Sequence, residues 1–394
     1  MFKKGALRTF LVLIENGSTQ RQLLPSLLRT AIKCDRMEFV VNILERIEPT
    51  EDALLIATEC ENADIVRLLV DDPRIVNHST ALCKSIELNS LEIFDLLLPH
   101  SNPIFSNNKP INLACELGRI EIVQKLLPIT NPFPNGLYEA VNNCQLEVLK
   151  CLLQDPRADP SVDDNNAIVS AAERGFSEIV KILMQDPRVD PSADNNSPIF
   201  FATRNNDAEL VRFLLQDSRV RPSDNNVLVA ACENGNVEIV ELLLQHPTTN
   251  PAMRRNRAIL TACDYGHIEI VRLLMNDPRV DPTSNNHFAM RYACQNGKPE
   301  IVRLLLSNPR IDPSAYDNFA IGIASENGYL EIVEMLMQDA RVNPSADNNY
   351  AICAANRNGH EKVVELLKKD ARVDSLAVNK DFVLKKRVNK AHEI

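Results

Sequence analysis

The chain contains no tryptophan and only 11 glycines among its 394 residues. Glycine supplies the positive backbone φ angles that tight turns and phosphate-binding loops require. Its scarcity therefore argues against a glycine-rich nucleotide loop and against an all-β architecture with many tight turns. No apolar run approaches the roughly 20 residues that a helix needs to cross a bilayer. Helices of a soluble protein are the expected elements.

Positive charge is also in deficit, with 43 Lys and Arg against 53 Asp and Glu and a formal net charge of -10. A phosphate backbone would be repelled, so we expect no nucleic-acid partner and no membrane partner. Lys3 and Lys4 precede an apolar run as in a signal peptide, but Arg8 interrupts that run and no small-residue cleavage site follows. The ten cysteines lie within helical patterns, which favours an intracellular, cytoplasmic protein.

The most informative feature is a repeat. The text "DPRVDPSADNN" from Asp186 recurs as "DPRVDPTSNN" from Asp277 and "DARVNPSADNN" from Asp339. Between such copies lies a second recurring text, for example "AILTACDYGHIEIVRLLMN" from Ala258. The interval is mostly 31 residues, and a fixed period indicates a repeat architecture. Weaker copies extend the pattern toward the N-terminus and predict about twelve units, at residues 21–48, 49–76, 77–104, 105–133, 134–164, 165–194, 195–224, 225–254, 255–284, 285–315, 316–347 and 348–376.

Each unit has the pattern of two short helices. Asparagine pairs such as Asn195 and Asn196 are predicted to cap the first helix. The first helix places Ile168, Ala171 and Ala172 at helical spacing, and a glycine then ends it at Gly175, Gly235, Gly266, Gly297, Gly328 and Gly359. The second helix places Ile179, Val180, Leu183 and Met184 on one face. Helices this short are not stable alone, so each unit must pack against the next.

These units resemble the ankyrin repeat. "GHIEIVRLL" from Gly266 to Leu274 and "GHEKVVELL" from Gly359 to Leu367 look like the second helix of that family. The family's T-P-L-H-x-A motif survives only in part, as "SPIFFA" from Ser197 and "KPINLA" from Lys109. The resemblance implies an all-α, elongated solenoid of about twelve stacked helix-turn-helix repeats, with short proline-containing connecting loops and no catalytic centre.

The two ends are predicted to be capping helices, at residues 1–20 and 377–394, because solenoids need polar ends for solubility. The C-terminal cap contains a basic cluster of Lys385, Lys386, Arg387 and Lys390. This cluster leaves a nuclear import signal, and hence a nuclear location, as an alternative.

The recurring acids raise the question of a calcium loop. The segment from Asp186 lacks the central glycine and the bidentate glutamate of the known calcium loop, and Arg188 stands among its acids. We therefore favour a stiffened turn between helices. An arginine recurs here in most units and could form an anion-binding ladder. We favour a mixed, solvated edge, because acids such as Asp159, Asp190 and Asp281 recur two residues after it.

Cysteines at equivalent positions could indicate zinc. Cys232, Cys263 and Cys294 occupy the same place in three successive units, but equivalent positions of stacked helices lie roughly 8 to 10 Å apart. A small buried residue is the simpler interpretation. Cys263 and His267 make a weak nucleophile pair because Gly266 breaks the helix between them. We predict no catalytic residues, no metal site, no cofactor and no enzymatic activity.

A partner should bind where neighbouring units differ, because the shared residues build the core. Just before the glycine, the first helices carry Asp264, Tyr265, Gln295, Glu326 and Arg357. Phe288, Phe319 and Tyr350 occupy one equivalent position in three successive units. These residues form the predicted partner-binding set, suited to apolar and basic groups. The alternative is that the three rings stack on each other and on helix ends as staples.

The predicted function is a non-catalytic, monomeric scaffold or adaptor that binds a partner protein through the variable helix and loop surface. An alternative is the substrate-recognition subunit of a ubiquitin ligase or another effector complex. A metalloprotein or hydrolase is the least favoured class, since no catalytic motif stands out.

Overall fold

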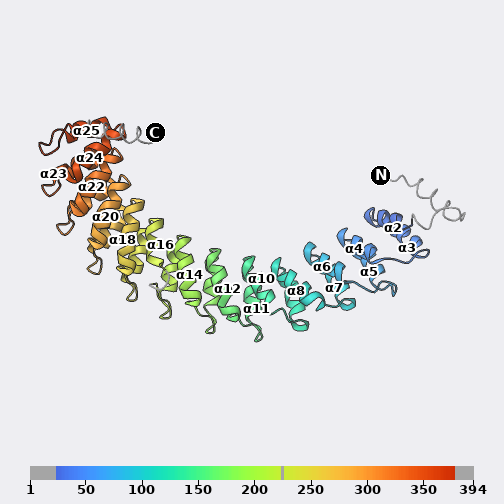
Figure 1. Ribbon diagram of the computed structural model, residues 1–394. Coiled ribbons are helices and arrows are strands. Elements are labelled where there is room, and N and C mark those ends of the chain that lie inside the picture. The colour runs from blue at the N-terminus through green and yellow to red at the C-terminus, as the bar shows by residue number, and fades with distance from the viewer. Residues whose placement is uncertain (1–23, 223–225, 378–394) are drawn as a thin grey trace, which may run out of the picture. The chain divides into compact units, whose positions relative to one another are not determined.

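The computed structural model describes residues 24–222 and 226–377, except for the side chains of residues 284–286 (Figure 1). These ranges contain 24 α-helices and two short 3-10 helices, and no strand. Nor does any helix within them have the length and apolar character to cross a membrane. The all-α solenoid predicted from the sequence is confirmed. The predicted capping helices fall, apart from residue 377, outside the described residues.

The chain divides into two compact units, of which the first covers residues 1–190. In this unit each odd-numbered α-helix packs against the even-numbered helix before it, and successive even-numbered helices also pack side by side. Its helices are α2 Leu24–Lys33, α3 Met37–Leu44, α4 Glu51–Glu59, α5 Ala63–Val70, α6 Ser79–Leu88, α7 Leu91–Leu97, η2 Leu98–His100, α8 Phe105–Glu116, α9 Ile120–Leu126, η3 Leu127–Ile129, α10 Asn135–Asn142, α11 Leu146–Leu153, α12 Val162–Glu173 and α13 Ser177–Leu183.

The second compact unit covers residues 191–394 and is built in the same way. The first helices of its repeats, α14 to α24 in even numbers, lie in a row, and the second helices form a parallel row (Figure 1). The helices are α14 Ala193–Arg204, α15 Ala208–Leu214, α16 Val227–Asn234, α17 Val237–Gln245, α18 Met253–Tyr265, α19 Ile268–Asn276, α20 Ser284–Gln295, α21 Pro299–Leu306, α22 Ala315–Glu326, α23 Leu330–Gln338, α24 Ala346–Arg357 and α25 Glu361–Leu367.

The core consists of the residues that repeat. Ile179, Val180 and Leu183 of the second helix are fully buried, as are Ile168 and the alanines of the first helix. Burying one such branched side chain contributes about 1.5 to 3 kcal/mol. Alanines let neighbouring helices approach closely. Packing therefore stabilises helices of seven to thirteen residues that would not persist alone.

The glycines end the first helices as predicted. Gly235 and Gly266 are the C-cap residues of α16 and α18, with φ of 76° and 91°. At Gly297 a side chain would also collide, because an added Cβ would lie 2.6 Å from the ring of Tyr329 in the next repeat. Glycine is therefore required there both by its left-handed backbone and by the close approach of the next repeat.

The prediction that asparagine pairs cap the first helices is wrong. In α14, Asp194, Asn195 and Asn196 form a left-handed turn with φ of 49°, 56° and 64°, and the N-cap residue of this helix is Ser192 and not an asparagine. Instead, the amide oxygen of Asn196 accepts a hydrogen bond from the backbone N–H of Arg221, at 2.6 Å. Asparagine suits this place because it tolerates the left-handed region and its short side chain carries an acceptor.

This contact, which we call the asparagine tie, recurs and at six places joins residues 25 apart. A longer contact of the same kind, from the N–H of Asn131 to Oδ1 of Asn108 at 3.5 Å, spans 23 residues. Oδ1 accepts the N–H in each case except one, where Nδ1 of His287 replaces it at 3.1 Å from the N–H of Asp312. The tie replaces a helix cap by a link between consecutive repeats. Its acceptors are Asn165, Asn196, Asn256, His287, Asn318 and Asn349, and its donors are Asp190, Arg221, Asp281, Asp312, Asn343 and Asp374.

Candidate functional site

The recurring arginines of the connecting turns are occupied by the protein itself. Arg157 donates from Nε and Nη2 to the two carboxylate oxygens of Asp155, at 2.9 and 2.6 Å. Its Nη1 and Nη2 also donate to the carbonyl oxygens of Thr130 and Leu127 in the preceding repeat. The hydrogen bond from Arg157 lowers the pKa of Asp155 below its usual value. An anion would have to displace these bonds.

The same pairing of an arginine with the aspartate two residues before it recurs at Arg74, Arg188, Arg219, Arg279, Arg341 and Arg372. The main partner of each of these arginines is thus the aspartate two residues before it, and the edge is of mixed charge as the sequence predicted. Arg310 is different because Asn308 replaces the aspartate. Its Nη2 instead lies 3.0 Å from Oδ1 of Asp281 in the preceding repeat, the acid that comes two residues after Arg279. The edge is therefore a structural clamp of mixed charge.

The three cysteines at equivalent positions lie in the core. Cys232, Cys263 and Cys294 are fully buried, and burial raises the pKa of all three thiols. His267 lies with Nε2 3.2 Å from the carbonyl oxygen of Glu233 and stacks on the ring of Tyr265. Its ring is therefore used to link repeats. Within the described residues, no three His, Cys, Asp or Glu side chains are placed to share a metal ion.

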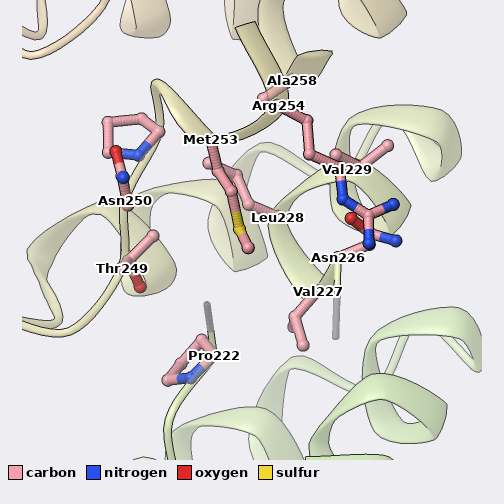
Figure 2. A pocket seen from close by; sticks show the side chains of 11 residues that line it. Pro222, Asn226, Val227, Leu228, Val229, Thr249, Asn250, Met253, Arg254 and Ala258 are labelled. Carbon is pink, nitrogen blue, oxygen red and sulfur yellow. The ribbon is translucent and has the colours of Figure 1, made fainter. Parts of the chain in front are cut away.

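A small cavity in the second unit is also no ligand site. It is lined mainly by apolar groups from the turns and first helices of two repeats, among them Pro222, Leu228, Met253 and Ala258 (Figure 2). Its volume of about 20 Å³ holds roughly one water molecule. A cofactor or drug-sized ligand needs a far larger cavity.

The predicted helix-end residues are partly engaged in internal bonds. Asp264 accepts a hydrogen bond from Asn296, and Oε2 of Glu326 accepts one from the hydroxyl of Tyr350 at 2.7 Å. This bond raises the pKa of Tyr350. Gln295 and Arg357 have exposed side chains. The acids therefore hold neighbouring repeats together.

The predicted aromatic row is half-buried, and none of its three rings stacks on another among the described residues. Phe319 instead lies over the guanidinium of Arg291 in the preceding repeat, with Cζ 4.5 Å from its ring centroid. Tyr350 takes the corresponding place over Gly322, where an added Cβ would lie 2.9 Å from its ring. Phe319 and Tyr350 thus pack against the first helix of the preceding repeat, whereas Phe288 contacts Arg291 and Tyr292 of its own helix.

The structure adds two residues that the sequence interpretation missed. Arg291 is surrounded by three rings, with Cζ 4.3 Å from the centroid of Phe288 and 4.6 Å from that of Tyr316, besides Phe319. Tyr316 is 60% exposed. We call Phe288, Arg291, Tyr316 and Phe319 the arginine–aromatic cluster. In the sequence, the cluster could have been recognised from Arg291, a charged residue at a position that is Val169, Leu260 or Gly322 in other repeats.

Stacked pairs of short helices, with a glycine after most first helices from α8 onward, define a helical repeat protein. The chain belongs to the ankyrin repeat family, whose pattern of ankyrin repeats in three copies matches residues 54–135, 137–226, 228–317 and 290–377. Among solved structures, it is similar to the ankyrin repeat domain of Bcl-3, described as a unique member of the IkappaB protein family. The TM-score is 0.43 and the identity 20%, over 51% of this chain and 97% of that one. No curated protein matches the chain.

Proposed function

We propose that the chain is a non-catalytic adaptor that binds a partner protein through the helix ends and turns of α18, α20, α22 and α24. Ankyrin repeats are generally protein–protein interaction modules, and their fold is typically a non-enzymatic scaffold. The observation that carries the location is the exposure of two tyrosines on this part of the chain. Tyr265 is 55% exposed and Tyr316 is 60% exposed.

Exposed tyrosines whose rings are held by neighbouring side chains can contribute strongly to the binding of a partner. Tyr265 stacks on His267 with an interplanar angle of 10°, and Tyr316 packs edge-on against Phe319. Each ring therefore loses little conformational freedom when a partner covers it. Tyrosine is enriched among the residues that dominate binding energy at interfaces.

The other predicted residues divide by role under this proposal. Gln295 and Arg357, which are exposed, contact the partner directly. Phe288, Phe319 and Tyr350 support the surface from beneath, while Asp264 and Glu326 fix the helix ends through their internal hydrogen bonds. The ubiquitin-ligase role stays a prediction, which copurification of other ligase subunits with the chain would support.

The test is partner capture with paired tyrosine variants. The immobilised chain is incubated with lysate, retained proteins are identified by mass spectrometry, and the affinity of the principal partner is measured by calorimetry. Tyr265→Ser with Tyr316→Ser should weaken binding by roughly 30-fold or more if either ring is a hot spot. Tyr138→Ser is the control, because Tyr138 is also exposed, at 42%, but lies in the first unit. Equal affinity for the paired variant and the wild type would refute the proposed surface.

A further inference from the structure

Three arginines stand together at one turn, two of them at positions where other repeats carry acids. The left-handed turn that opens α18 consists of Arg254, Arg255 and Asn256, and Arg257 follows it. All three arginines are exposed. The corresponding positions of other repeats hold Asp163, Asp164, Asp194, Asp317 and Asp347. The charge of this one turn is thus reversed in a chain whose net charge is -10.

These arginines are not used within the fold. Among the described residues, no carboxylate lies within ion-pair distance of Arg254, Arg255 or Arg257, whereas Arg279 of the same repeat is clamped by Asp277 at 2.6 Å. Figure 2 shows Arg254 extending from its turn toward the preceding repeat, where it lines the small cavity beside Asn226 and Val229. Adjacent like charges repel, and arginine tolerates a left-handed backbone less well than asparagine does.

The turn is continuous with the arginine–aromatic cluster. Helices α18, α20 and α22 pack side by side in this order (Figure 1). Arg257, Phe288 and Phe319 occupy the same position in these three helices, so stacking brings them into one row. Arg291 extends the positive charge into the rings. Its Nε is shut off from solvent and has no hydrogen-bond partner, and no ion pair is found for Arg291 among the described residues.

The three rings restrict the orientation of the Arg291 guanidinium. Rings at 4.3 to 4.6 Å from Cζ restrict its rotation, and attraction between the cation and the π-faces favours this arrangement. Nε is buried, while the residue as a whole is half-buried, so part of the side chain still meets solvent. A fixed guanidinium is the group that recognises a carboxylate through two parallel hydrogen bonds.

We propose that Arg254, Arg255, Arg257 and Arg291, with the adjoining rings, bind an acidic, extended segment of the partner protein. This inference rests on the proposed function and reverses the partner charge expected from the helix-end acids, which hold internal bonds instead. Carboxylates of the segment pair with the arginines, and an apolar side chain of the segment packs on Tyr316. A nucleic acid is disfavoured by the net negative charge of the chain.

A library of random twelve-residue peptides displayed on phage provides the probe. The library is selected on the immobilised full chain at physiological salt, and the retained peptides are sequenced. They should be rich in Asp and Glu next to an apolar residue. Arg254→Gln, Arg255→Gln and Arg257→Gln combined should reduce their retention by roughly tenfold or more, because bidentate pairs are lost. Arg291→Lys, which keeps the charge but not the planar fork, should reduce it as well.

The control changes the same amount of charge elsewhere in the second unit. Arg212, Arg272 and Arg303 lie on second helices in exposed ion pairs, so their replacement by Gln should alter neither folding nor retention. Circular dichroism of every variant verifies helix content. Selection of neutral or basic peptides, no selection at all, or undiminished retention by the arginine variants would overturn the inference.

A fluorescent single-stranded oligothymidylate of 20 nucleotides is tested in parallel. If it binds and the same arginine variants abolish its binding, the surface takes nucleic acid and the inference fails. The proposed function fails separately. Should the captured partner require Tyr265 and Tyr316 but bind the arginine variants normally, the adaptor surface stands and only its acidic ligand is refuted.

Discussion

The asparagine tie predicts a specific order of stability among substitutions at Asn318. Its Oδ1 lies 2.6 Å from the backbone nitrogen of Asn343, and its backbone is left-handed, with φ of 58° and ψ of 35°. Loss of the acceptor leaves the half-buried N–H unpaired, which costs about 1 to 2 kcal/mol. Alanine in a left-handed backbone costs about 1 kcal/mol more. Asn318→Ala should therefore lower the free energy of unfolding by about 2 to 3 kcal/mol.

Two companion variants separate these contributions. Asn318→Gly removes the acceptor, but glycine adopts the left-handed backbone without strain. The free energy of unfolding should therefore fall by about 1 to 2 kcal/mol. Asn318→Asp keeps both an acceptor oxygen and tolerance of the left-handed region, so it should stay within about 0.5 kcal/mol of the wild type.

Urea unfolding followed by circular dichroism measures the order, and hydrogen exchange of the α22 amides reports local opening where the array does not unfold in one step. A Gly variant as stable as the wild type would show that the tie contributes nothing. Equal losses for Gly and Ala would show that the left-handed backbone carries no cost.

Three further predictions concern packing, close approach and charge. Leu274→Ala should cost about 2 to 5 kcal/mol in urea unfolding, because the side chain is fully buried; a loss under about 1 kcal/mol would contradict the packing. Gly297→Ala should lower the melting temperature more than Gly359→Ala, since both backbones are left-handed but only at Gly297 would the Cβ meet a tyrosine ring; equal shifts would exclude a collision. The pKa of Asp339 is lowered by the arginine that it binds, so its stabilisation exists above the unfolded pKa of about 3.9 and is lost as the pH falls through the folded value. Asp339→Asn should accordingly lose less stability than the wild type between pH 6 and pH 3, and parallel pH profiles would refute this pairing.

The fold was predictable because the same residue pattern recurs in many repeats. Leu183 and Gly175 belong to positions that recur along the chain, so helix spacing and helix ends could be recognised from many copies. The wrong assignment concerned asparagine, whose preference for helix caps and for left-handed turns has the same cause, a short polar side chain that bonds to nearby backbone. The choice was decided by a donor 25 residues away, such as Asn343 for Asn318.

The site was only partly predictable. Phe288 and Phe319 stood out as a row, but the sequence could not show that both rings contact Arg291 and do not stack on each other. Tyr316 escaped notice because it lies in a turn whose equivalent positions hold polar residues of several kinds, among them Asp194, Arg254 and Asp347. Arg291 escaped because its importance depends on three rings from two repeats. Interpretation of single positions does not capture such joint arrangements.

The 25-residue reach of the asparagine tie has a consequence for how such a chain can change its length. Where consecutive repeats are 31 residues long, removal or duplication of any 31-residue stretch leaves each acceptor with an equivalent donor 25 residues further on, wherever the cut begins. The copy number can therefore change by unequal recombination without a compensating mutation. Changes of this kind outside α18, α20, α22 and α24 would leave the proposed binding surface intact.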